Sequence, residues 1–362
     1  MTADAPPTRR PEAATRAPRA ARPPSDYAQL LAIIQSAGLL GRRYSYYAVR
    51  LALLLLALGG VGVAFTVVGD SWWQLLVATG AAIVLTQIIF FSHDAAHRQI
   101  FTSHRANENT ARIMGTLIGG VSLSWWNNKH NRHHAAPNQI GRDSDIDPSI
   151  VHFFPADTPP RSRIGLWLHQ RQGIWFFPLL IVEMLNLHVQ GVQALLTQPG
   201  LRRRRTELGM LGVRLGGYPA ALFWLLSPGR AVAFLAVQLA VTGLYLGGAF
   251  SASHIGMPVL PRDARVDFFR RQVETSRNVL GGAAASFAMG GLNYQIEHHL
   301  FPNMARPNLH RARPLIQQFC REHHVTYHEV NILQAWGIVV TYLNRVGLTA
   351  RAFQCPITAT LR

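Results

Sequence analysis

The sequence predicts an all-α integral membrane protein with four transmembrane helices in two hairpins and a helical cytoplasmic cap. Two observations predict this fold class. Apolar runs long enough to cross a bilayer occur in two close pairs, and nearly all Lys and Arg residues lie outside the short connectors within each pair. Apolar residues make up 49% of the 362 residues, yet 35 Lys and Arg against 18 Asp and Glu give a formal net charge of +17.

The first hairpin is predicted over about 48–69 and 72–92. Its first run reads LALLLLALGGVGVAFTVVG, and the second contains no charged residue over 72–91. Each run has the length that a membrane-spanning helix needs, and only a short connector separates them.

The second hairpin is predicted over about 208–227 and 231–252. Its first helix is the weaker of the two because it contains Arg214, although an arginine near a helix end can extend to the membrane surface. The interrupted apolar segment 174–196 contains Glu183, and we interpret it as an interfacial helix instead of a fifth span.

The distribution of basic residues predicts the orientation. Arg230 is the single basic residue in the two hairpin connectors, so both termini and the middle of the chain are expected in the cytoplasm. The cap would cover about 93–207 and 253–350. We interpret the basic excess as membrane orientation and attraction to anionic lipid headgroups, and the sequence contains no nucleic-acid-binding motif.

Both ends of the chain are expected to be tails. Residues 1–25 are rich in Pro, Ala and Arg and lack the apolar region of a secretory signal, so we expect them to form a disordered cytoplasmic tail. Residues 351–362 are expected to form a short C-terminal tail. Cys320 and Cys355 are too few for a disulfide framework and are expected in the reducing cytoplasm.

Histidines gather in three short motifs at the predicted membrane surface. His93 and His97, in HDAAH, follow the second apolar run four residues apart and project from one helical face. HNRHH places histidines at i, i+3 and i+4, so three imidazoles converge from one helix. NYQIEHHLFP repeats that spacing with Gln295 in the leading position.

A further histidine ends the fourth apolar run in SASHIG, and the predicted topology returns it to the cytoplasmic face. The eight candidate metal ligands are His93, His97, His130, His133, His134, His254, His298 and His299. Asp94 and Glu297 lie inside the motifs as candidate partners that fix ring tautomers. The other eight histidines lack this spacing and are not taken as ligands; three of them lie in REHHVTYHEV, a polar stretch that predicts a surface helix and loop.

Eight imidazoles exceed what one metal can use, so two metal ions are predicted. Cysteine, which structural zinc favours, is absent from the motifs, and hard cations would favour carboxylates. Imidazole-rich sites suit iron, copper or zinc. A two-metal site at a membrane surface suggests oxygen chemistry on a molecule dissolved in the bilayer, for which non-haem iron is the usual metal.

The order HDAAH, HNRHH, QIEHH around two pairs of spans resembles the three histidine boxes of the integral-membrane fatty acid desaturases. The resemblance runs from about 44 to about 329, and GGLNYQIEHHLFPNM is its most specific string. The leading glutamine is typical of the front-end, linoleoyl-CoA desaturase-like branch, and the chain is most similar to bacterial members without a fused cytochrome b5. RQVETSRNV and GRDSDID also resemble segments of that branch.

This resemblance implies a di-iron oxidoreductase that uses O2 and two electrons to form a cis double bond in an acyl chain carried on CoA or on a lipid. The histidines of the boxes would ligate the iron ions, with His254 completing the site. Gln295 would bind iron weakly or through water, or would form a hydrogen bond with a group next to the ligands. The desaturase domain is expected over 26–350, in a bacterial cytoplasmic membrane with the metal site on the cytoplasmic side.

No HPGG haem motif occurs in the sequence, so we expect electrons from a separate ferredoxin-like or cytochrome b5-like carrier with an NAD(P)H reductase. The basic cap would attract an acidic carrier by charge. Two alternatives stay open: an acyl-chain or lipid hydroxylase with the same di-iron site, and a metal transporter or sensor. The transporter is disfavoured because the apolar spans hold no His, Asp or Glu between their ends, where transport sites usually lie.

Overall fold

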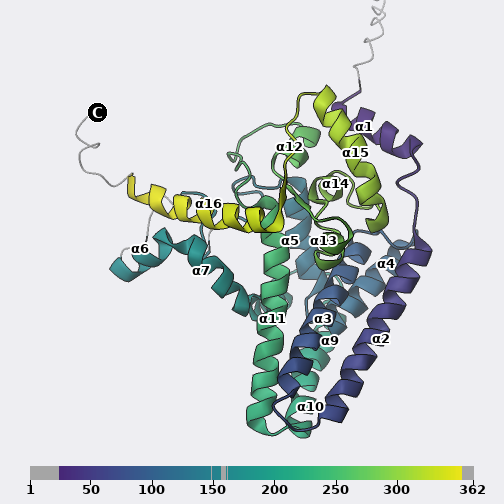
Figure 1. The fold of residues 1–362 in the computed structure, drawn as a ribbon, viewed down its shortest axis with the longest axis vertical. Helices are drawn as coiled ribbons and strands as arrows, with labels where there is room; N and C mark the ends of the chain where they lie inside the picture. Colours follow the sequence, from purple (N-terminus) through teal and green to yellow (C-terminus); the bar gives the residue numbers. More distant parts are fainter. Residues whose placement is uncertain (1–23, 148, 156–159, 161, 353–362) are drawn as a thin grey trace, which may run out of the picture.

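The computed structural model describes residues 24–352 except 148, 156–159 and 161 (Figure 1). The predicted tails therefore lie almost wholly outside the described residues, as does Cys355. The described chain is mostly helical, as predicted, and one parallel pair of short strands, β1 (Asn278–Leu280) and β2 (Glu329–Asn331), adds to the helices.

Four long helical segments run alongside one another and form the lower part of the molecule in Figure 1. They are α2 (Tyr44–Val68), α3 (Gln74–Ala96), the continuous segment made of α9 (Arg204–Gly212), η3 (Val213–Gly217) and α10 (Tyr218–Leu225), and α11 (Pro228–His254). Each has the length and apolar character of a membrane span. At the bottom of the bundle Arg230 pairs with Asp70 at 2.6 Å, so the two connectors meet at one end.

A fifth segment also meets the criteria of length and apolar composition. It comprises α7 (Gln172–Leu179), η2 (Leu180–Val182) and α8 (Glu183–Thr197). Its 3-10 turn crosses α11 at Gly243, where an added Cβ would lie 2.4 Å from the Leu180 carbonyl oxygen. By length and composition, five helices of the described residues could therefore span a membrane instead of four, and the interfacial placement of 174–196 stays a prediction.

Two further helices run crosswise to α11 in Figure 1. They are α6 (Arg163–Gln170) and α16 (Ile332–Ala352), and α16 packs against both α6 and α7. This contact is close because Gly173 has no side chain: a Cβ there would lie 2.1 Å from the Val340 carbonyl oxygen.

The remaining helices lie around and above the upper end of the bundle in Figure 1. They are α1 (Asp26–Ser36), α4 (His104–Ala111), η1 (Arg112–Ile118), α5 (Leu123–Ala135), α12 (Phe268–Glu274), α13 (Gly282–Ala288), α14 (Gln295–Leu300) and α15 (Arg306–Glu322). Buried side chains of α1, α12, α14 and α15 form one apolar core that includes Ile34, Phe269, Ile296 and Ile316. This core holds α14, which carries the third histidine motif, in a fixed position.

The start of α5 is held by a buried carboxylate. Glu207 of α9 is fully buried and accepts hydrogen bonds from the Ser122 hydroxyl at 2.7 Å and the Ser124 hydroxyl at 2.7 Å. It also accepts from the Ser124 backbone N–H at 3.2 Å and from Arg112 Nε at 3.2 Å. A carboxylate at a helix N-terminus satisfies N–H groups that lack a helical partner. Glu207 therefore fixes the helix that presents HNRHH.

Candidate metal centre

Four helix ends bring all eight predicted histidines together where the bundle meets the cap. His93 lies in the last turn of α3 and His97 is its C-terminal cap residue, while His254 is the last residue of α11. The other five come from α5 and α14. The i, i+3 and i, i+4 spacings place each set on one face of its helix.

One group contains His93, His97, His130 and His298. One ring nitrogen from each of these residues lies within 4.8 Å of the others. The closest pair is His97 Nε2 and His130 Nε2, at 2.8 Å. Because Nε2 of His93 and Nε2 of His298 are buried without a hydrogen-bond partner, both are free to ligate a cation.

A second group contains His133, His254 and His299, by the same 4.8 Å criterion. His254 Nε2 lies 3.1 Å from His299 Nε2. His134 lies between the two groups, with Nε2 3.0 Å from His130 Nε2 and its ring stacked on His299 at 4.2 Å between centroids. The HNRHH motif therefore contributes to both groups instead of forming one triad.

Hydrogen bonds orient the second group. His133 Nδ1 lies 3.0 Å from Asp143 Oδ2, His254 Nδ1 lies 3.0 Å from the Thr275 carbonyl oxygen, and His299 Nδ1 lies 2.9 Å from Gln272 Oε1. An imidazole that donates from Nδ1 presents the lone pair of Nε2 to the group. Burial alone would raise the pKa of Asp143, but His133 and two backbone N–H groups lower it below its usual value, so this partner is a carboxylate.

Burial also favours the neutral form of most of the rings, although at His133 the effect of burial is exceeded by Asp143 and Asp145, which raise the pKa. Burial lowers the pKa of His97, His130, His134, His298 and His299 well below the usual value, and the neighbouring histidines lower it further. A cluster of neutral imidazoles with inward lone pairs is a ligand set for borderline transition metals. The donor set and the unpaired ring nitrogens therefore fit two metal ions.

The three other predicted residues have different surroundings. The amide nitrogen of Gln295 lies 2.9 Å from His254 Nε2, and its Oε1 is buried without a hydrogen-bond partner. Asp94 pairs with Arg306 at 2.7 Å and lies 3.9 Å from His93 Nδ1. Glu297 accepts hydrogen bonds from Tyr327 at 2.6 Å and Asn278 at 2.7 Å, so its contacts in the described chain tie α14 to β1 and to the segment before β2.

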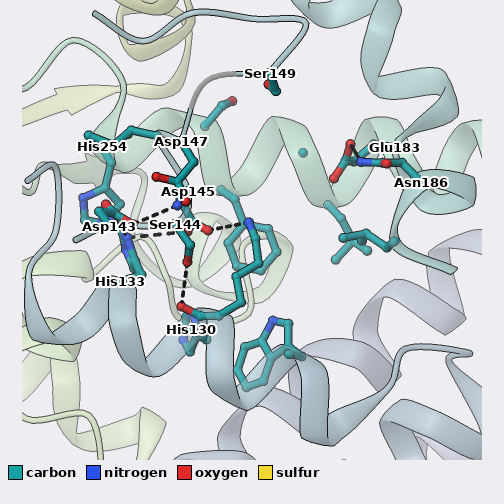
Figure 2. A pocket seen from close by; sticks show the side chains of 18 of the residues that line it. His130, His133, Asp143, Ser144, Asp145, Asp147, Ser149, Glu183, Asn186 and His254 are labelled. Atoms are coloured by element: carbon teal, nitrogen blue, oxygen red, sulfur yellow. Dashed lines mark hydrogen bonds and ion pairs between the residues drawn. The ribbon is translucent and has the colours of Figure 1, made fainter. Parts of the chain in front are cut away.

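A cavity of about 860 Å³ opens beside the histidines. His130, His133 and His254 lie on one side of it, with Asp143 and Asp145 next to them (Figure 2). Its other walls are largely apolar and come from α5, α7, α8 and α11. Among the apolar lining residues are Trp125, Trp126, Phe176, Leu180, Leu246 and Phe250.

The family model that matches this chain is that of the fatty acid desaturases, over residues 70–331. The chain belongs to the fatty acid desaturase family. The match covers α3 to β2 and therefore every histidine of the two groups. It confirms the resemblance seen in the three histidine motifs.

Several curated proteins that are similar to this chain are named as desaturases. The chain is 30% identical over 279 residues to an acyl-lipid (9-3)-desaturase of Physcomitrium patens, which covers 74% of this chain and 52% of that protein. It is 28% identical to a Delta(6)-fatty-acid desaturase of Caenorhabditis elegans, covering 70% and 60%. It is 26% identical to a Delta 8-(E)-sphingolipid desaturase of Kluyveromyces lactis, covering 92% and 61%. The chain thus spans less than two thirds of the length of each.

Several residues around the centre had no predicted role. Asp143 lies in GRDSDID, and Gln272 and Thr275 lie in RQVETSRNV, the two strings that resembled the desaturases without an assigned function. The two strings were therefore recognisable in the sequence. Which histidine each of these polar residues contacts depends on the fold, because the partners lie far apart along the chain. Trp126 stacks on His130 at 4.1 Å between centroids and also contacts His93, and no histidine-spacing argument identifies it.

Proposed function

We propose that this protein is an oxidoreductase that introduces a cis double bond into a fatty acyl chain carried on CoA or on a lipid. The observation that carries the proposal is the convergence of eight histidines beside a largely apolar cavity in a chain of the desaturase family. In the reaction O2, two electrons and two protons take two hydrogens from adjacent methylenes, and two water molecules are released.

The metal ligands in this proposal are the eight histidines. His93, His97, His130 and His298 would hold one iron ion, and His133, His254 and His299 the other, with His134 between them. The iron centre would supply the oxidant, because an unactivated C–H bond offers nothing for an acid or base to attack. Gln295 is proposed to lie within reach of the second ion and to bind it weakly or through water.

The protein's own residues position these rings and shield the centre from water. Asp143, Gln272 and the Thr275 carbonyl hold three imidazoles in one tautomer. Trp126 stacks on His130, and the apolar wall would exclude water from the place where an acyl chain would lie.

Electrons are proposed to come from a separate ferredoxin-like or cytochrome b5-like carrier and its NAD(P)H reductase. We also propose four spans, with 174–196 at the membrane interface and with both termini and the metal centre on the cytoplasmic side of a bacterial membrane. The basic excess of the chain supports an acidic carrier.

The test is expression in a host that lacks the expected product, with saturated, monounsaturated and diunsaturated chains supplied. Mass spectrometry should locate a new cis double bond, and the His298→Ala variant should give none. A hydroxylated chain as the main product would favour the alternative hydroxylase activity. No modified chain, despite bound iron and a working electron donor, would refute both.

A further inference from the structure

Helix α8 presents a polar stripe to the cavity beside the metal centre. Glu183, Asn186 and Gln190 follow one another at i, i+3 and i+7 on one helical face, and all three line the cavity. Asn186 donates a hydrogen bond to Glu183 at 3.1 Å, and Gln190 donates to Asn186 at 2.8 Å. Elsewhere this helix is largely apolar and exposes Leu185 and Val189.

The Glu183 carboxylate has no counter-ion among the described residues: no Lys, Arg or His nitrogen lies within 4.0 Å of it. The two cationic side chains that line the same cavity have partners already. Lys129 pairs with Asp145 at 2.6 Å, and Arg132 lies 3.9 Å from Asp147. This wall of the cavity therefore carries a carboxylate without a direct ion pair, and Lys129, already paired with Asp145, attracts it only from a greater distance.

Figure 2 shows Glu183 and Asn186 together, on the side of the cavity away from His133 and Asp143. The apolar residues Leu180, Leu187 and Phe250 line the same cavity. A chain lying against the apolar wall beside the histidines could thus place a polar end at Glu183. The cavity has the two kinds of surface that an amphiphile needs, a long apolar wall and one polar position.

The chemistry of this position is selective. An ionised carboxylate only accepts hydrogen bonds, so it favours a hydroxyl, an amide N–H or an ammonium group. It repels a free carboxylate or a phosphate, because bringing like charges together is unfavourable. The Asn186 amide donates to the carboxylate, and Gln190 holds Asn186 in turn.

We infer that Glu183, supported by Asn186, recognises the polar end of the substrate and selects an acyl lipid whose polar end donates hydrogen bonds. This inference rests on the proposed desaturation and specifies its substrate class. Two kinds of lipid have this chemistry: an N-acylated long-chain amino alcohol, which offers an amide and hydroxyls, and an acylglycerol with a free hydroxyl. A free fatty acid and a phosphatidic acid lack it.

The first experiment measures binding, independently of turnover. The purified full chain in lipid nanodiscs is titrated with these four lipids, all with the same acyl chain, and each displaces a fluorescent acyl probe. We expect the two hydrogen-bond-donating lipids to bind about tenfold more tightly than the two acids. Glu183→Gln should reduce this preference by about tenfold, because hydrogen bonds to charged groups are stronger than those to neutral groups. Glu322→Gln, the same change on the exposed surface of α15, should leave it intact.

Asn186→Leu provides a second variant on the same face and should weaken donor binding in the same direction. Iron content and melting temperature equal to those of the native chain show that each variant is folded. If the amide lipid binds more tightly than the acylglycerol, the substrate is an N-acylated amino alcohol. If the acylglycerol binds more tightly, the substrate is an acylglycerol.

Equal binding of donors and acids, or a preference that both Glu183→Gln and Asn186→Leu leave unchanged, would overturn the inference. The second experiment supplies the same lipids for turnover. Desaturation of all lipids alike would contradict the inference and leave the proposed function standing. Preferential binding through Glu183 with no new double bond in any lipid would refute the proposed function instead.

Discussion

Within the part of the chain that the structure describes, three of the eight clustered imidazoles have a hydrogen-bond partner at Nδ1, and all three belong to the second group. Asp143, Gln272 and the Thr275 carbonyl are these partners. Such contacts fix the ring that donates and raise its basicity as a ligand. The partners, and not the histidines alone, therefore set the orientation of this half of the centre.

Asp143→Ala should lower the metal affinity of the second group by about 10- to 100-fold, which is typical when the hydrogen-bond partner of a ligand is removed. The first group has no contact with Asp143, so its metal should stay. Metal analysis of the purified protein at limiting iron should then show about one ion lost of two. Asp263→Ala, an exposed site, serves as the control, and two ions retained in Asp143→Ala would contradict the orienting role.

Gln295 is 5% exposed and lies beside His254. Gln295→Ala should reduce turnover more than iron content, because an amide oxygen is a weaker ligand than an imidazole nitrogen and the histidines would still hold the metal. Parallel measurement of product formation and bound iron tests this. Full activity in the variant would show that the leading position of the third motif only fills the helix face.

Helix α11 can approach the turn between α7 and α8 because small residues lie at the crossing. The Leu180 and Met184 backbones lie against Gly243, and the Leu180 side chain lies against Gly247. The same crossing positions the wall of the cavity and the end of α11 that carries His254. Packing at this point therefore links the fold of two elements to the geometry of the site.

Gly243→Ala should destabilise the protein by about 1–3 kcal/mol, because the added methyl group would overlap the Leu180 backbone. Gly229→Ala, in the same helix, has open space around its Cβ position. It should be neutral or stabilise the helix by up to about 1 kcal/mol. Thermal unfolding of both variants in the same detergent compares them, and equal melting temperatures would mean that the crossing is not tightly packed.

The bundle as a whole exposes apolar side chains where a soluble protein would place polar ones. Helix α2 exposes Leu56, Val63 and Val67, while α3 is buried along most of its length between α2 and α11. Large apolar side chains around a bundle are stable against lipid. The cap, by contrast, carries much of the excess positive charge in residues such as Arg262, Arg265 and Arg311.

If this charge attracts an acidic electron carrier, turnover with the purified carrier should fall as salt rises. A decrease of about tenfold in the second-order rate constant between low and physiological ionic strength is typical of electrostatically steered association. A small uncharged reductant in place of the carrier should show no such dependence. A salt-independent rate with the protein carrier would exclude charge steering.

The sequence by itself determined the helical membrane character, the eight clustered histidines and the family, because apolar length and helical spacing are local properties that survive folding unchanged. The sequence did not determine the number of spans: 172–197 is apolar enough to span, but its Glu183 and Asn186 are typical of an interfacial helix. Local composition does not distinguish a membrane span from an interfacial helix here, because in either placement the polar face can lie against protein or water.

Only the tertiary structure decided how the histidines divide and what orients them. His130 and His133 share one face of α5, yet they join different groups, because the ends of α3 and α11 approach that face from different sides. The partners of Asp143 and Gln272 lie 10 and 27 residues away in the sequence, and Glu183 lies on the wall of the same cavity as His254 of another helix. Long-range contacts of this kind depend on how helices pack, which spacing within one helix does not encode.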